Sequence, residues 1–398
     1  MSAPARVDFG GFARAALFAL TPAAAAGGGL ALAPLLGLAG AASIRPSLLR
    51  ADLTRPPGWL VLLALFTAWL ALSALWSPYD DAQQALRFAL TLATGLLFAR
   101  GAGAAPHLTM FAGLAAIVVL AALLAIEAAA DMPLNRAANP GLLTWQLAGN
   151  PGRGAAVLTA LIWAGAGWLT LRGARRAAAL ALIIAAALAM QFGQTANILA
   201  FLVGALAFGL GYAAPRLGIY AINAVWTLWL LAAPLISPLI AQVLAGGGAP
   251  YSWIARTEIW RYVSARIAER PWLGHGLDAS RADTGEIVVQ GHTVSAIPLH
   301  PHSASLHIWY ETGAVGAVLA AACLLFGARA LSRAVAGERT LAAASCGVLG
   351  AVGVIANISF GAWQEWWNAT ILIAAGLTAA LFGMRQSAVA PGARVGHN

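Results

Sequence analysis

Residues 107–129 read HLTMFAGLAAIVVLAALLAIEAA, an almost wholly apolar run that holds a single carboxylate, Glu127. A helix of about 20 such residues crosses the hydrocarbon core of a bilayer. Similar runs recur along the 398-residue chain, of which 61% is hydrophobic and 9% is charged. Because soluble domains carry about 25% charged residues, the composition excludes a soluble enzyme. It predicts an all-α protein, a polytopic membrane helical bundle.

The apolar runs predict about twelve transmembrane helices. They cover residues 12–26, 28–44, 57–76, 84–100, 107–129, 154–171, 177–192, 195–212, 217–245, 304–328, 340–360 and 364–384. Helices 1–9 therefore occupy 1–245, a large loop occupies 246–303, helices 10–12 occupy 304–384, and 385–398 form a tail. A cleaved signal peptide is an alternative for the first run, which is short and precedes an Ala-rich stretch.

The distribution of arginine predicts the orientation of the chain. The net charge of +9 comes from 23 arginines, since the sequence has no lysine. With a cytoplasmic N-terminus, fifteen arginines fall on the cytoplasmic side, against three opposite them outside the large loop, as the positive-inside rule requires. The fifteen are Arg6, Arg14, Arg45, Arg50, Arg55, Arg100, Arg172, Arg175, Arg176, Arg216, Arg329, Arg333, Arg339, Arg385 and Arg394, and the three are Arg87, Arg136 and Arg153. We therefore expect both termini in the cytoplasm, the loop 246–303 in the periplasm, and no nucleic-acid partner.

The large loop opens with a predicted amphipathic helix, YSWIARTEIWRYVSARIAER, over 251–270. At 100° per residue Arg256 lies in the centre of the apolar face, near Trp260, whereas Arg261 points away from it. An arginine in that position needs an anionic partner. A clamp for a phosphate or diphosphate is one interpretation, and a side chain that reaches the bilayer surface is the other.

A second stretch, LHPHSASLHIWYETGAVGAV, covers 299–318 and contains the candidate base His302. Ser303 is the predicted N-cap of the helix that follows. His302 would then lie at the positive end of the helix dipole, which disfavours imidazolium. A neutral imidazole can act as a general base. His300 is a weaker candidate, and a structural role is the alternative for each histidine.

Other polar and aromatic residues have simpler interpretations. Arg153 is either a second phosphate contact or an interfacial anchor, and Glu311 pairs with His307 at i,i+4. The three tryptophans of GAWQEWW, at 363, 366 and 367, look like an aromatic belt. Cys323 and Cys346 are core residues, and no spacing implies a metal site.

These two stretches resemble the O-antigen ligase and polymerase superfamily of bacterial inner-membrane glycosyltransferases. The family signature, a His and a small polar residue, nine residues, then GxxG, stands here as His302-Ser303, 304–312 and 313–316. Upstream, Arg256-Thr-Glu-Ile-Trp260 and ERPWLGHG (269–276) are similar to the family's R…W and P-x-x-G-x-G segments. The layout of spans around one large loop is also similar.

The resemblance implies transfer of a polysaccharide from undecaprenyl diphosphate to a hydroxyl of lipid A–core, without cofactor or metal and with inversion. His302 would be the base and Arg256 would hold the diphosphate. The candidate substrate contacts are Arg153, His300, Arg261, Trp260 and Ser303. The family's further arginine is missing, because 191–197 reads QFGQTAN, and Arg153 is the proposed substitute. A polymerase of the same superfamily, or a lipid-linked oligosaccharide flippase, are the alternatives.

Overall fold

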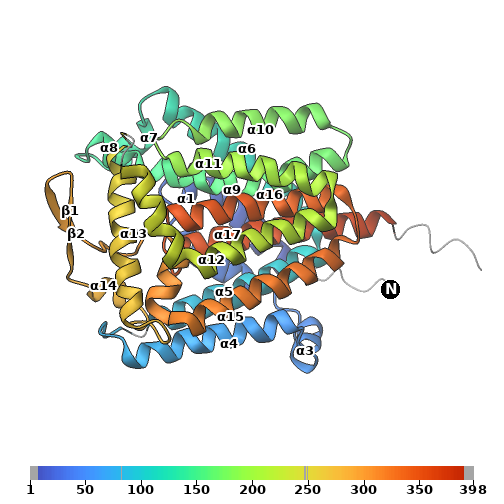
Figure 1. Cartoon of the computed structure of the whole chain (residues 1–398). Helices are drawn as coiled ribbons and strands as arrows, with labels where there is room; N and C mark the ends of the chain where they lie inside the picture. Colours follow the sequence, from blue (N-terminus) through green and yellow to red (C-terminus); the bar gives the residue numbers. More distant parts are fainter. Residues whose placement is uncertain (1–7, 82, 246–247, 249, 390–398) are drawn as a thin grey trace, which may run out of the picture.

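A computed structural model describes residues 8–81, 83–245, 248 and 250–389 as a bundle of long helices with a small cap across one end (Figure 1). The predicted cytoplasmic residues Arg6 and Arg394 and most of the 385–398 tail lie outside these residues. The elements are α1 (Phe9–Ala26), α2 (Leu32–Ala42), α3 (Pro46–Thr54), α4 (Gly58–Ser73), η1 (Ala74–Trp76), α5 (Gln83–Ala104), α6 (Pro106–Ala129), α7 (Pro133–Ala138), α8 (Thr144–Leu147), α9 (Gly149–Leu171), α10 (Arg175–Ala189), α11 (Thr195–Ala213), α12 (Pro215–Ala245), α13 (Tyr251–Glu269), α14 (Ala279–Ala282), β1 (Glu286–Val289), β2 (His292–Ser295), α15 (Ala304–Val335), α16 (Arg339–Ile358) and α17 (Glu365–Val389).

The helical membrane architecture predicted from the sequence is confirmed, but the number of long spans is smaller. Within the described residues, ten helices are long and apolar enough to cross a membrane, rather than about twelve. The difference falls on the predicted spans 28–44 and 177–192, which are the 11-residue α2 and the 15-residue α10. Both are shorter than the roughly 17–25 residues of a typical span. The glycines at 27–29 and the break at 190–194 shorten these two helices, and the apolar composition of the sequence hides the interruptions.

The core of the bundle forms around α9 and α16, the two most buried spans. Small residues let neighbouring helices approach them closely. Trp163 of α9 is completely buried, its ring lies 5.2 Å from that of Phe201, and it packs against Gly204 and Gly347. One end of each core helix, Arg153 of α9 and Ile358 of α16, faces the cap.

The cap is built from the loop 246–303, and its main element is the predicted amphipathic helix. α13 lies across the end of the bundle, roughly perpendicular to the long helices (Figure 1). Its buried residues Ile259, Trp260, Val263 and Ile267 pack with Leu306 and Tyr310 of α15. This packing fixes α13 against the start of α15, so residues 256 and 302 belong to one rigid arrangement.

A short hairpin is the one element of the cap that differs from the all-helical expectation. β1 and β2 pair antiparallel, with Val289 opposite His292. The two connecting residues, Gln290 and Gly291, both have positive φ, at 50° and 85°. That conformation matches the two-residue turn that joins right-twisted strands.

Candidate active site

A cavity of about 430 Å³ lies between the cap and the end of the bundle, and four of the predicted site residues line it. These four are Arg153, Arg256, His300 and His302. They come from α9, from α13 and from the segment before α15, which lie far apart in the sequence. The packing of α13 on α15 is what brings the two predicted stretches to the same cavity.

His302 is held in one orientation and one tautomer. Its Nδ1 lies 2.8 Å from the carbonyl oxygen of Ser359, which can only accept, so Nδ1 donates a proton there. The neutral ring therefore has its lone pair on Nε2, the atom that a general base uses. None of the described residues forms a hydrogen bond with that Nε2 atom.

The electrostatics of the cavity keep His302 neutral. Burial and, to a lesser extent, the positive charge of Arg256 lower the pKa of His302 to about 4, against the opposing effect of the hydrogen bond to the Ser359 carbonyl. Burial also lowers the pKa of His300 well below its usual value. Both imidazoles are therefore uncharged near neutral pH, mainly because they are buried and not because of the helix dipole expected for His302.

His300 acts on the backbone of His302. His302 has a left-handed conformation, with φ of 55°, which is uncommon for a residue with a side chain. Its N–H donates to Nδ1 of His300 at 3.1 Å, a bond that stabilises this conformation. Trp260, also a predicted substrate contact, is buried and donates from Nε1 to the carbonyl of Pro301 at 3.0 Å. The hydrogen bonds of His300 and Trp260 thus hold the backbone of residues 301 and 302, and with it the position of the His302 ring.

Arg256 is a half-buried cation without a carboxylate partner among the described residues. Its Nη1 donates to the carbonyl of Ser252 at 2.9 Å, and its Nε atom is buried with no partner. Burial lowers the pKa of the guanidinium, which still stays protonated because free arginine titrates above about 12. An anion beside the guanidinium would offset this partial desolvation. The anion clamp and the side chain that reaches the bilayer surface both stay predictions for Arg256.

Three other arginines of the cap form ordinary ion pairs. Arg261 forms a 2.7 Å ion pair with Glu258, Arg266 pairs with Glu269, and Arg281 lies 3.3 Å from Asp278. Arg261, a predicted substrate contact, does not line the cavity, because it points to another side of α13. Ser303 is buried and serves as the predicted N-cap of α15, where its Oγ accepts from Leu306 N at 3.4 Å.

Arg153 faces Arg256 across a cavity that also contains the start of α11. Its guanidinium lies 6.0 Å from the ring centroid of Trp366, a cation–π distance, and no described carboxylate pairs with it. The segment without the expected arginine contributes Gly193, Gln194 and Thr195 to the lining. The Oε1 atom of Gln194 is buried without a partner.

A break in α15 joins the two motif segments. Gly313 has φ of 61° and ψ of −165°, a region that essentially only glycine occupies. The break frees backbone groups for the 271–276 segment: His275 N donates to Tyr310 O at 2.8 Å, Gly276 N to Glu311 O at 2.9 Å, and Ala314 N to Pro271 O at 2.8 Å. The backbone that lies closest to Gly313 is that of the P-x-x-G-x-G segment, at Trp272 and Gly274.

Glu311 anchors the same region from inside the protein. It is completely buried, and its carboxylate receives five bonds, two from Ser280 and one each from Asp278 N, His307 and Trp363. The predicted pairing with His307 is confirmed at 2.9 Å. Nδ1 of that histidine accepts from Ala362 N at 3.0 Å, so this imidazole is structural.

The predicted aromatic belt is wrong. Trp363, Trp366 and Trp367 are at most 5% exposed. The indole of Trp363 donates to Glu311 at 2.6 Å, and that of Trp366 lies under Arg153. The run of three tryptophans at the start of a span resembles a belt in sequence, but α17 begins beneath the cap, where these rings face the interior.

Comparisons with known proteins agree with the resemblance seen in the motifs. A family model described as O-antigen ligase matches residues 179–321, which include α13, the His302 segment and the Gly313 break. Three related rickettsial proteins are named polysaccharide ligases on a provisional basis. The relative from Rickettsia prowazekii is 28% identical over 152 residues, 35% of this chain and 37% of its own length. The one from Rickettsia felis is 26% identical over 226 residues, 54% of each chain, and the one from Rickettsia conorii is 28% identical over 149 residues, 35% and 36%.

The protein is thus a polytopic, mainly helical membrane protein that resembles the O-antigen ligases. The matches span between about a third and about half of the length of these relatives. The family match and the relatives support a ligase-type or polymerase-type activity of a membrane enzyme on polysaccharide.

Proposed function

We propose that this chain is an inverting glycosyltransferase that moves O-antigen polysaccharide from undecaprenyl diphosphate to a hydroxyl of lipid A–core, without a metal ion. One observation carries the proposal: a neutral His302 whose Nε2 is free shares a cavity with the unpaired Arg256. The predicted orientation puts this cavity on the periplasmic face of the inner membrane. The arginine distribution supports that orientation.

The reaction follows from these two groups. Nε2 of His302 removes the proton of the acceptor hydroxyl, whose oxygen attacks the anomeric carbon of the donor sugar. The bond from that carbon to the diphosphate oxygen breaks, and its electron pair leaves with the diphosphate. Attack on the face opposite the leaving group inverts the anomeric centre. Arg256 stabilises the charge that develops on the leaving group, as fixed donors do in a water-poor site.

The low pKa of His302 gives the donor a second role. Without donor, burial and Arg256 hold that pKa at about 4, too low for an efficient base near neutral pH. A bound diphosphate neutralises Arg256 and adds negative charge beside the imidazole, which raises the pKa. The base would thus become effective after the donor has bound.

Arg153 is the proposed second cation for the diphosphate. Support comes from its place on the same cavity as Arg256 and from the absence of a described carboxylate partner. The N–H groups at the start of α11 would add to it, since helix N-termini favour anions. Arg153 and these N–H groups would supply the positive charge that the arginine missing from 191–197 provides in the family. His300, Trp260 and Ser303 are assigned the positioning of His302.

The test is product analysis with purified protein, undecaprenyl-diphosphate glycan and lipid A–core. Wild type is compared with His302→Ala and with His292→Ala, whose histidine is exposed on the hairpin and serves as the matched control. The proposal predicts glycan on lipid A–core in wild type and control, and none with His302→Ala. Glycan that lengthens on undecaprenyl diphosphate instead would identify a polymerase. Equal transfer by all three proteins would refute the role of His302 as the base. No transfer by any of them would refute the transferase and favour a flippase.

A further inference from the structure

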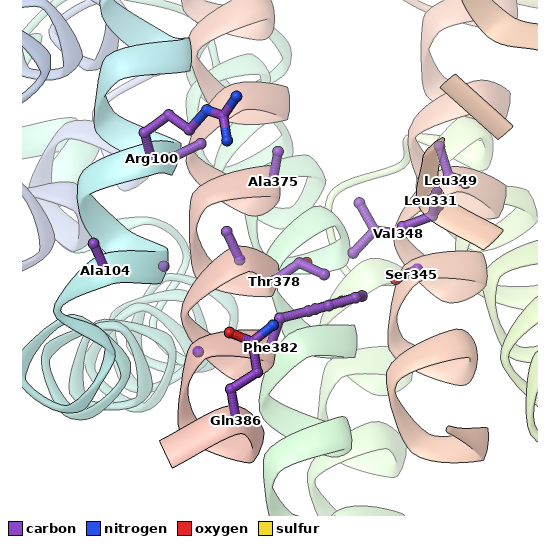
Figure 2. A pocket seen from close by; sticks show the side chains of 14 residues that line it. Arg100, Ala104, Leu331, Ser345, Val348, Leu349, Ala375, Thr378, Phe382 and Gln386 are labelled. Atoms are coloured by element: carbon purple, nitrogen blue, oxygen red, sulfur yellow. The ribbon is translucent and has the colours of Figure 1, made fainter. Parts of the chain in front are cut away.

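A second cavity, of about 550 Å³, lies between the long helices (Figure 2). Its walls come from α5, α15, α16 and α17, and include Ala99, Ala104, Leu331, Val348, Ala375 and Phe382. No sequence motif drew attention to this region, and the proposed glycan transfer does not use it.

The cavity lies at the end of the bundle opposite to the active site. Near the active site, Gln84 at the start of α5 donates to the carbonyl of Trp363 at 2.8 Å, and α16 ends beside Ser359. Arg100 lines the second cavity sixteen residues further along α5, about 24 Å away at the rise of an α-helix. On the predicted orientation this end faces the cytoplasm.

The walls suit a hydrocarbon chain. They are mainly alanine, leucine, valine and phenylalanine, on helices that are long and apolar enough to span a membrane. Protein interiors contain few voids larger than a water molecule, and apolar cavities stay dry and accept apolar ligands. At membrane depth the surrounding acyl chains are the nearest material that fits.

The polar edge of the cavity suits an anionic headgroup. Arg100 of α5 lies at one end of the lining (Figure 2), and its side chain is 48% exposed. One of its five N–H donors bonds to Asp52 of α3 at 2.6 Å, which leaves others for a phosphate. Arg50 and Arg55 lie in and beside α3, so the three arginines outweigh the one aspartate. Such a basic cluster next to a membrane span attracts anionic lipid.

We propose that this cavity is a binding site for one anionic phospholipid. An acyl chain lies among α5, α15, α16 and α17, and the phosphate contacts the guanidinium of Arg100. The site is separate from the glycan cavity and does not depend on the proposed transfer reaction.

The experiment uses the full chain in nanodiscs that contain phosphatidylglycerol with a photoactivatable acyl chain. Labelled peptides are identified by mass spectrometry. Wild type is compared with Ala104→Phe, which fills the cavity, and with Ala93→Phe as matched control. Both alanines are exposed residues of α5, but only Ala104 lines the cavity. We expect labelling around Leu331 and Phe382 in wild type and control, and its loss in Ala104→Phe.

Two further measurements keep the proposal falsifiable if Ala104→Phe does not fold. Arg100→Gln should weaken competition by unlabelled phosphatidylglycerol by about fivefold, the effect of one basic residue near a membrane surface. In wild type, unlabelled phosphatidylcholine should compete with the labelled lipid less well than unlabelled phosphatidylglycerol does, by a similar factor. Labelling that is equal in Ala104→Phe and Ala93→Phe would overturn the site. The assignment of an anionic headgroup would be overturned if both unlabelled lipids competed equally well for the wild-type site. It would also be overturned if unlabelled phosphatidylglycerol competed equally well in Arg100→Gln and in wild type.

Discussion

The break at Gly313 provides the most specific test of how the two motif segments meet. Gly313→Ala places a Cβ where it overlaps the carbonyl group of Trp272, in a backbone conformation that essentially only glycine adopts. The strain alone is worth about 1–3 kcal/mol. Relief of the overlap would also weaken some of the four backbone hydrogen bonds between α15 and the 271–276 segment, each worth about 0.5–1.5 kcal/mol. We therefore expect a loss of roughly 2–5 kcal/mol in the free energy of unfolding.

The matched control is Gly327→Ala on the same helix. A Cβ at Gly327 meets no atom within 4 Å, and alanine stabilises a helix interior by about 0.5–1 kcal/mol relative to glycine. Thermal unfolding in one detergent, together with glycan transfer, compares the two variants with wild type. Gly313→Ala should unfold at a lower temperature and lose transfer, whereas Gly327→Ala should keep both. A Gly313→Ala protein as stable and as active as wild type would refute this account of the break.

Three further predictions concern the groups around the cavity. Stability should fall as the pH drops from 6.5 towards 4, because the unfolded state protonates histidine near 6.5 while folded His300 and His302 have lowered pKa values. The free energy of unfolding should change by at most about 1.4 kcal/mol per pH unit for each imidazole. A His302→Gln protein whose free energy of unfolding depends on pH as that of wild type does would contradict the lowered pKa of His302. Glu311→Gln should destabilise the protein by about 1–3 kcal/mol, because an amide N–H₂ would face donors in a buried site; unfolding curves that superimpose on those of wild type would argue against an ionised carboxylate. Arg153→Gln should weaken donor binding more than Arg136→Gln, whose arginine is exposed and paired with Asp131 at 2.5 Å; equal affinities in a binding titration would remove Arg153 from the site.

Sequence patterns predicted those features that depend on local chemistry. The apolar runs identified ten long spans, the amphipathic pattern set the limits of α13 to within a residue, and Ser303 marked the start of α15. The pairing of His307 with Glu311 followed from helix geometry alone. Each of these depends on residues within a few turns of one another.

Features that depend on contacts between distant segments could not be predicted in this way. Ser359 contributes to the site only through its backbone carbonyl, which leaves no mark in a sequence. The tryptophans at 363–367 have the composition of a belt, but Trp366 and Trp367 belong to the core of the bundle and Trp363 packs against Phe66 and Phe88 of distant helices. The hairpin had a local signal in the sequence, two short β-branched stretches on either side of Gln290-Gly291. The description of 246–303 as a loop overlooked it.

Separate measurement of donor binding and of transfer distinguishes the role of His302 as the base from that of Arg256 in binding the diphosphate. Undecaprenyl-diphosphate glycan is titrated onto wild type, His302→Gln, Arg256→Gln and Arg261→Gln, and single-turnover transfer is then followed with saturating donor. We expect His302→Gln to bind donor like wild type but to transfer it about 10²–10⁴-fold more slowly, as loss of a general base requires. Arg256→Gln should lose donor affinity, and Arg261→Gln should behave as wild type. Transfer by His302→Gln at the wild-type rate, or unchanged donor affinity in Arg256→Gln, would contradict the account.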